Sequence, residues 1–375
     1  MAENIRILLT EKAKLTTNSN LVFLLVFLLV FLLVFLLVFL SKNSKNLLEE
    51  KMGFSKSAVL SVAAAFSLAS GAALAAYPEK PVKILVGFSA GGGTDTTSRG
   101  FASYMHEAES MAGQPAYIVN LPGASGQKAA KMVLGEKADG HTLYMINIGT
   151  FIVGELAKGK DKPYSVKDDW VNLGCMSQLV TSLQVHSSHP AKNIAEFVAA
   201  AKASGKTHTW GTSGATTMHS GIGHLFFDTY GIPHKKVPFK GGSKARAALV
   251  SQSVESVFGG NNTIAGFEDT IRPLATAGAD RDPTMKDLAT FKEQGMNGAD
   301  FTGLFCLFAP KGVSDEVKTK VGSAIKHIAG IKGFKKFMKK NNLGAFYVDA
   351  DAAVKAQNVM YKTMGPVVEK ILSSQ

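Results

Sequence analysis

The chain has 375 residues and a formal net charge of +12 at pH 7, with 46% hydrophobic and 19% charged residues. A basic balance of this kind is compatible with nucleic acid, an anionic membrane surface or small anionic ligands as partners. Two cysteines are too few for a disulfide scaffold, and no C-x-x-C or H-E-x-x-H motif indicates a metal site.

The N-terminal part of the chain contains five copies of Leu-Val-Phe-Leu, at residues 21–40. Twenty apolar residues form a helix about 30 Å long, which is enough to span a bilayer. A perfect four-residue repeat is unusual for an evolved membrane helix, so we interpret residues 1–51 as an upstream extension or a mis-assigned start. The alternative is a membrane anchor at residues 21–40 that holds the rest of the chain outside the membrane.

Residues 52–75 have the pattern of a signal peptide. Lysines flank Met52, residues 58–70 are small and apolar, and Ala73-Leu74-Ala75 fits a signal peptidase site. We therefore expect Met52 to be the natural start and Ala76 to be the first residue of an exported protein with one large or two medium-sized domains. Export argues against a nucleic-acid partner.

The first segment that indicates a ligand site is a glycine-rich loop. The apolar run 84–88 leads to Gly91-Gly92-Gly93, and Thr94 and Asp95 then open a predicted helix over residues 96–109. Glycine allows close approach of a ligand, and the free amides of a helix N-terminus attract an anion. Gly93 stands where a P-loop has its lysine, so nucleotide hydrolysis is not expected. The alternative is a glycine-rich turn that binds nothing.

Beyond this loop, strand-like and helix-like patterns alternate along the chain. The predicted strands are residues 116–120, 142–147, 180–185, 207–212 and 237–239. The predicted helices are residues 127–137 and 194–203, a third that ends near residue 230 and a fourth that ends near residue 251. This alternation predicts an α/β fold with a mostly parallel sheet, in which ligands bind beyond the carboxyl ends of the strands.

A series of motifs resembles the Bug family, the extracytoplasmic solute receptors of tripartite tricarboxylate transporters, which is also called the TctC family. The motifs cover nearly all of the exported chain, and their ordered combination is specific although no single motif is decisive. They are residues 77–83, 87–95, 120–126, 139–143, 210–219, 238–243 and 307–312.

The resemblance implies a type II periplasmic-binding-protein fold, in which two α/β lobes joined by a hinge close on a ligand in the cleft between them. The chain would cross to the second lobe near Val180 and return near Asp300. Lobe 1 would then comprise residues 76–180 and 301–375, and lobe 2 residues 181–300.

Cys175 and Cys306 lie beside these two crossings, each within an apolar run. We expect two buried free thiols by default. An oxidising compartment permits a disulfide if the two strands are neighbours.

The resemblance also implies a function: a monomeric periplasmic receptor that captures a small organic anion, such as a di- or tricarboxylate, and delivers it to membrane permease subunits. Loop amides, hydroxyls and ordered waters would hold the carboxylates, without catalytic residues, a metal or a cofactor. The implied ligand-binding residues are Phe88, Ser89, Ala90, Gly91, Gly92, Thr94, Asp95, Thr150, Thr212, Ser213, Thr216, Thr217, His219, Lys240 and Gly241.

Departures from the family pattern leave the identity of the ligand open. Ser89 stands where family members commonly have proline, and Trp210 takes a position that is often tyrosine. The segment Gly259-Gly260-Asn261-Asn262 lacks the aspartate that commonly follows this strand. A ligand sensor with the same fold is an alternative function, and an exported enzyme is a less favoured one because no nucleophile and base stand out.

Several of the implied contact residues also have structural interpretations. Asp95 can cap its own helix, and His219 can be a buried histidine with an internal partner. Thr150 can be a turn residue, and Lys240 a solvated side chain at the rim of the cleft. Phe88 can belong to the core as well as to the cleft wall.

Overall fold

The computed structural model describes residues 77–373, which lie within one compact unit of the chain. The extension 1–51 with its apolar repeat at 21–40, and the signal peptide 52–75, fall outside the described residues. Within residues 77–373, no helix has both the length and the apolar character that crossing a membrane requires.

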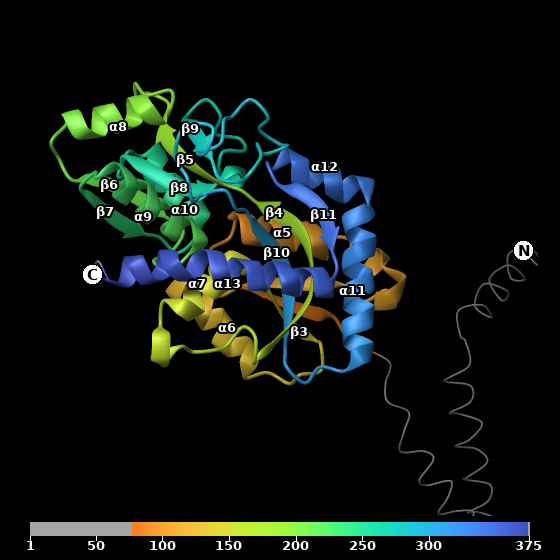
Figure 1. Cartoon of the computed structure of the whole chain (residues 1–375). Coiled ribbons are helices and arrows are strands. Elements are labelled where there is room, and N and C mark those ends of the chain that lie inside the picture. Colours follow the sequence, from red (N-terminus) through yellow and green to blue (C-terminus); the bar gives the residue numbers. More distant parts are fainter. Residues whose placement is uncertain (1–76, 374–375) are drawn as a thin grey trace, which may run out of the picture. The chain divides into compact units, whose positions relative to one another are not determined.

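The first sheet has the strand order β11-β4-β10-β3-β1-β2. Figure 1 labels its members β11, β4, β10 and β3. β1 pairs in parallel with β2 and β3, whereas β10 runs antiparallel to β3 and β4, and β11 antiparallel to β4. We call the part of the chain built on this sheet lobe 1. Its strands are β1 (Val82–Val86), β2 (Ala116–Asn120), β3 (Thr142–Asn147), β4 (Trp170–Leu179), β10 (Gly303–Pro310) and β11 (Gly344–Val348).

The second sheet has the order β7-β6-β8-β5-β9 and defines lobe 2. β6 is parallel to β7 and β8, and β5 is antiparallel to β8 and β9. Its strands are β5 (Thr181–His186), β6 (His208–Thr212), β7 (His234–Pro238), β8 (Ser256–Gly260) and β9 (Ile271–Thr276). Both sheets are mixed, so the expectation of a mostly parallel sheet is wrong. The physical reason is that the strand by which the chain enters each lobe, β5 in lobe 2 and β10 in lobe 1, runs against the strands of that lobe's βαβ units.

Helices connect the strands and cover the sheets. The predicted helix at 194–203 is confirmed as α8, whose N-cap residue Asn193 accepts a hydrogen bond from the amide of Glu196 at 2.9 Å. The helix after the first glycine loop begins three residues earlier than expected, at Gly93, and ends at Ala102. The helices are α5 (Gly93–Ala102), α6 (Gln127–Leu134), α7 (Ile148–Leu156), α8 (Ile194–Ala203), α9 (Met218–Tyr230), α10 (Gly242–Val250), α11 (Asp315–Gly330), α12 (Lys332–Lys340) and α13 (Ala350–Ser373).

Three segments join the two lobes. A single residue, Val180, separates β4 in lobe 1 from β5 in lobe 2, and the chain returns to lobe 1 at β10. The C-terminal helix α13 packs against α7 and β4 of lobe 1 and also against α9 of lobe 2 (Figure 1). Rotation of one lobe against the other must therefore be accommodated by the β4–β5 and β9–β10 connections and by α13.

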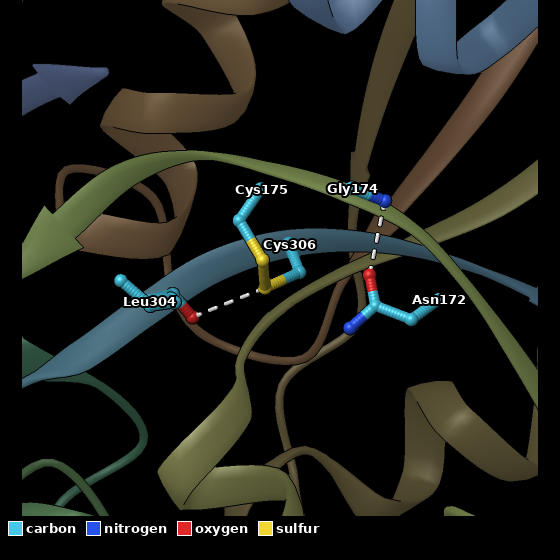
Figure 2. Close-up of a disulfide and its surroundings, with 5 residues drawn as sticks. All are labelled: Asn172, Gly174, Cys175, Leu304 and Cys306. Carbon is cyan, nitrogen blue, oxygen red and sulfur yellow. Dashed lines mark hydrogen bonds between the residues drawn. A yellow bond between two sulfur atoms is a disulfide. The ribbon is translucent and has the colours of Figure 1, made fainter. Parts of the chain in front are cut away.

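A disulfide joins Cys175 of β4 to Cys306 of β10, two residues that are directly paired in the sheet (Figure 2). The expectation of free thiols is therefore wrong, because the fold makes the two strands neighbours. Both cysteines are fully buried. The bond links the strand that leaves lobe 1 to the strand that returns to it.

Aromatic clusters fill both lobes. In lobe 1, Phe151 packs against Trp170 and Phe308 with ring centroids 5.2 and 5.0 Å apart. In lobe 2, the fully buried Trp210 packs against Phe258, and its indole nitrogen donates to Nδ1 of His234 at 3.0 Å. Trp210 is thus a core residue of lobe 2.

Candidate functional site

The connections that follow strands β1, β3, β6, β7 and β8 line one cavity, which has a volume of about 30 Å³ and takes residues from both lobes. We call it the inner cavity. Each connection leads from the carboxyl end of a strand into the first turn of a helix or of the 3₁₀ turn Asn261–Thr263. Its lining residues are Phe88, Gly92, Gly93, Thr94, Asn147, Thr150, Leu179, Ser213, His219, Gly242, Gly260, Asn262, Thr263 and Phe305.

The N-terminus of α5 forms the lobe 1 side of this cavity. Its N-cap residue is Gly92, and no described side chain caps it. A Cβ atom at Gly93 would lie 2.9 Å from Oδ1 of Asn262 and 3.1 Å from Cζ of Phe305, so glycine is required for this close approach between the lobes. The first-turn amides of α5 have no acceptor within the helix and carry the positive end of its dipole.

The N-terminus of α10 comes from lobe 2 and faces that of α5. A Cβ atom at Gly92 would lie 3.5 Å from the amide nitrogen of Gly242 and 3.8 Å from that of Ser243. Among the described side chains, none caps α10 or the turn Asn261–Thr263 either. By contrast, α7 and α9 are capped by Asn147 and Thr217. Uncapped helix N-termini from two lobes therefore direct partial positive charge at one point, which suits an anion.

Two buried carboxamides add further donors. Asn147 and Asn262 line the cavity with 2% and 6% of their surface exposed, and the Nδ2 group of each has no partner among the residues described. Oδ1 of Asn147 is already engaged, because it accepts the amide of Thr150 at 3.1 Å. A buried amide donor without a partner destabilises the fold by about 1–3 kcal/mol, so a ligand acceptor would relieve this penalty.

No acidic or permanently cationic side chain is among the lining residues of the inner cavity. The titratable one is His219, whose Nδ1 lies 2.7 Å from the hydroxyl of Thr181. Burial lowers the pKa of His219 to about 4, so its imidazole is neutral at pH 7. The cavity therefore offers an anion dipoles and neutral donors rather than an ion pair.

Residues 101–372 match the sequence model of the family described as "Tripartite tricarboxylate transporter family receptor", TctC. The chain belongs to the TctC family. The matched range begins after Asp95, so the first glycine loop lies N-terminal to it. The family resemblance expected from the sequence is thus confirmed.

Curated relatives extend over most of the chain. The protein of the gbd 5′ region of Cupriavidus necator is 27% identical over 303 residues, which is 79% of this chain and 88% of the relative. Protein BugT of Bordetella pertussis is 24% identical over 245 residues, which is 64% of this chain and 74% of BugT.

Solved structures share the fold. The structure of a periplasmic transporter aligns with a TM-score of 0.74 at 25% identity, covering 79% of this chain and 98% of the other. MatC from Rhodopseudomonas palustris, solved with bound malate, aligns with a TM-score of 0.72 at 23% identity and covers 78% and 100%. A second R. palustris protein, solved with adipate, gives the same TM-score and identity and covers 78% and 97%. The type II periplasmic-binding-protein fold is confirmed.

Six of the residues that the sequence suggested for ligand contact lie on the inner cavity of this TctC receptor. They are Phe88, Gly92, Thr94, Thr150, Ser213 and His219. The others do not line it: Ser89, Ala90, Gly91, Asp95, Thr212, Thr216, Thr217, Lys240 and Gly241.

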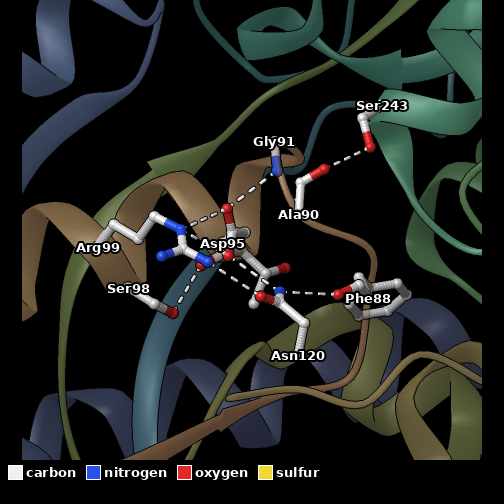
Figure 3. Close-up of polar contacts among 9 residues, drawn as sticks. Phe88, Ala90, Gly91, Asp95, Ser98, Arg99, Asn120 and Ser243 are labelled. Carbon is white, nitrogen blue, oxygen red and sulfur yellow. Dashed lines mark hydrogen bonds and ion pairs between the residues drawn. The ribbon is translucent and has the colours of Figure 1, made fainter. Parts of the chain in front are cut away.

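Asp95 holds the first loop in shape (Figure 3). Its buried carboxylate accepts hydrogen bonds from the amide of Gly91 at 2.9 Å, from Nε of Arg99 at 3.0 and 3.1 Å, and from Nδ2 of Asn120 at 2.9 Å. The same Asn120 amide group donates to the carbonyl of Phe88 at 3.0 Å. The carboxylate oxygens of Asp95 are occupied within lobe 1, but Asp95 does not cap α5, whose N-cap residue is Gly92.

The loop residues Ser89 and Ala90 contact lobe 2 directly. The amide and the hydroxyl of Ser89 both donate to the carbonyl oxygen of Lys240, each at 2.9 Å. The hydroxyl of Ser243 donates to the carbonyl of Ala90 at 2.8 Å (Figure 3). These groups hold the lobes together rather than face the inner cavity.

The lobe 2 threonines mostly shape their own loop. Thr217 caps α9 by accepting the amide of Ser220, and its hydroxyl lies 3.4 Å from that of Thr212. The amide of Thr216 donates to Oγ of Ser125 in lobe 1 at 3.0 Å. Ser213 alone among these loop hydroxyl residues reaches the cavity lining.

Sequence reasoning missed Asn147 and Asn262 as residues that line the inner cavity. Asn147 ends the predicted strand 142–147. Ligands bind beyond the carboxyl ends of strands in such sheets, so a polar amide side chain at this position could have indicated a site residue. Asn262 was noted only as a departure from the family pattern, since nothing in the sequence brings it next to Gly93.

Proposed function

We propose that this TctC receptor captures a small organic anion between its two lobes in the periplasm and delivers it to the membrane subunits of a tripartite tricarboxylate-type transporter. It would act by binding and release, without chemical change of the ligand. The signal-peptide pattern of residues 52–75 supports the location.

The observation that carries the proposal is the pair of uncapped helix N-termini, α5 from lobe 1 and α10 from lobe 2, that face each other beside two unpaired carboxamides. Hydrogen bonds to a charged acceptor contribute about 1.5–3 kcal/mol each. Three to five of them would provide the roughly 8 kcal/mol that micromolar affinity needs. Because donors come from both lobes, an anion between them favours the closed arrangement.

We propose a di- or tricarboxylate as the ligand class. The R. palustris structures with malate and adipate support this class, since they share the fold over nearly their full length. The cavity of about 30 Å³ has roughly the volume of one water molecule in the liquid. A ligand of four or more carbons would therefore enter while the lobes are apart. The lobes would then close around it by rotation at the β4–β5 and β9–β10 connections.

A thermal-shift screen tests this function, because binding to the folded state raises its stability by mass action. We expect a shift with at least one small carboxylate and none with neutral sugars. The hit should bind at least 100-fold more weakly to Asn262→Asp, which places a negative charge among the donors. Asn297→Asp, on an exposed loop outside the cavity, is the matched control. An unchanged affinity in Asn262→Asp would remove the inner cavity from the ligand site.

Delivery to a transporter needs a separate experiment. Cells that lack the gene should lose uptake of the labelled acid identified in the screen, and wild-type protein should restore it. Recovery of the acid unchanged after incubation with the purified protein would support binding without catalysis. Uptake that persists in the deletion strain would instead favour a sensing role.

A further inference from the structure

A second cavity of about 220 Å³ adjoins the inner one and is also built from both lobes. We call it the outer cavity. Phe88 and Ser213 line both cavities, so the two cavities lie next to the same pair of residues. Lobe 1 contributes residues 87–88 and 123–125, and lobe 2 contributes residues 213–215 and 238–240.

The chemistry of the outer cavity differs from that of the inner one. Its lining includes the apolar residues Phe88, Pro238 and Phe239, and the one charged residue among its described lining residues is Lys240. None of the described residues that line it is acidic. The Lys240 side chain is exposed, which places a cation at the solvent side of an otherwise mainly apolar space.

The lobe 1 wall is a segment with an unusual backbone. Gly123, Ala124, Ser125 and Gly126 have φ values of 150°, 46°, 54° and 94°. Non-glycine residues seldom adopt the left-handed region, and they persist there only where the surroundings enforce it. In this conformation Oγ of Ser125 accepts a hydrogen bond from the amide of Thr216, which connects this lobe 1 segment to lobe 2.

We infer that the outer cavity is a specificity subsite for the body of the ligand: it takes a methylene chain or an aromatic ring that extends from the carboxylate in the inner cavity, with a second anionic group near Lys240. This inference rests on the proposed function and narrows it to elongated or aromatic diacids. Apolar walls favour burial of carbon, and they leave an added hydroxyl without a hydrogen-bond partner.

Calorimetric titration with succinate, malate, adipate and terephthalate tests the ligand class. Adipate or terephthalate should bind at least about tenfold more tightly than succinate, since one methylene in an apolar pocket already changes affinity by about tenfold. Malate, which is succinate with a hydroxyl, should bind no better than succinate. Tightest binding by malate or succinate would overturn the inference and leave the proposed function intact. Binding by none of the acids would contradict the proposed function itself.

Two variants localise the effect to the outer cavity. Ala215→Leu should fill the space and weaken the long diacid at least tenfold, with less than a twofold change for succinate. Ala247→Leu, exposed on α10 and outside both cavities, is its matched control.

Lys240→Gln should weaken the binding of adipate about fivefold. It should leave the binding of hexanoate, which lacks the second carboxylate, unchanged. Lys244→Gln, exposed on α10, is the control for charge. Equal losses for short and long acids, or no loss in either variant, would rule out the subsite.

Discussion

Ser89 and Lys240 are joined across the cleft by two hydrogen bonds to one carbonyl oxygen, from the amide and from the hydroxyl of Ser89, each 2.9 Å long. Lys240 takes part through its backbone, while its side chain remains exposed. The contact therefore depends on the residue type at position 89 rather than at position 240.

Replacing Ser89 with proline should open the unliganded protein. Proline has neither an amide hydrogen nor a hydroxyl, so both bonds to Lys240 are lost. At about 0.5–1.5 kcal/mol each, the ratio of closed to open protein should fall about tenfold. Small-angle scattering should then show a larger radius of gyration. Ser89→Ala keeps the hydrogen bond from the backbone amide and should give a smaller change. Equal radii of gyration for the wild type and both variants would show that the Ser89–Lys240 hydrogen bonds do not hold the lobes closed.

The disulfide between Cys175 and Cys306 should stabilise the fold substantially. It closes a loop with a sequence separation of 131 residues, and a disulfide of this kind typically contributes about 2–4 kcal/mol. Urea unfolding of the double variant Cys175→Ala/Cys306→Ala should therefore show a loss of about that size. Thiol titration of the unfolded, unreduced wild-type protein should find no free thiol. Two titratable thiols would contradict the pairing.

The local chemistry of the ligand loops was visible in the sequence, whereas their contacts with each other were not. The triple glycine before Thr94 predicts a strand, a loop and a helix N-terminus from neighbouring residues alone. The structure has these elements in that order, although α5 begins at Gly93, three residues earlier than expected. The proximity of Gly93 to Asn262 joins residues from different lobes. No local propensity encodes such a contact, because lobe closure creates it.

The same distinction explains the other differences. The pairing of Cys175 with Cys306 depends on β10 returning beside β4, which is a property of topology rather than of either apolar run. Asp95 was a candidate for ligand contact because it follows the glycines. Its carboxylate is instead occupied by Arg99 and Asn120, and the position of Asn120 follows from the parallel pairing of β1 with β2.

Glu155 should be a structural carboxylate whose loss destabilises the protein. Its side chain is 7% exposed and accepts bonds from Lys162 at 3.0 Å, from the amide of Val166 at 2.9 Å, and from the hydroxyl of Tyr361 on α13. Burial and the bond to Glu155 raise the pKa of Tyr361, which therefore remains a donor at neutral pH. Glu155→Gln should cost about 2–4 kcal/mol in urea unfolding, because buried donors are left facing an amide.

Two single variants separate the contributions to the Glu155 cluster. Tyr361→Phe removes one buried bond and should cost about 1–2 kcal/mol. Lys162 is 42% exposed, so solvent screens its ion pair, and Lys162→Gln should destabilise the protein less than Tyr361→Phe does. If Lys162→Gln were as destabilising as Glu155→Gln, the surface ion pair rather than the buried bonds would be the main contribution.

His219 should make the folded state sensitive to acid. Burial lowers its folded-state pKa to about 4 from 6.5, so between these values the unfolded chain binds a proton that the folded protein does not. Stability is therefore unaffected above pH 6.5, falls as the pH is lowered from 6.5 to 4, and loses nothing more from this group below 4. The contribution amounts to about 2 kcal/mol between pH 7.5 and pH 5.

The variant His219→Gln isolates this contribution from those of His208 and His224, whose pKa values burial also lowers to about 4. Urea unfolding at pH 7.5 and at pH 5 should show that the variant loses about 2 kcal/mol less than the wild type over this interval. If His219→Gln were as sensitive to acid as the wild type, the His219 imidazole would take up its proton in the folded protein. A protonated imidazole at the inner cavity would then donate a hydrogen bond to a bound anion.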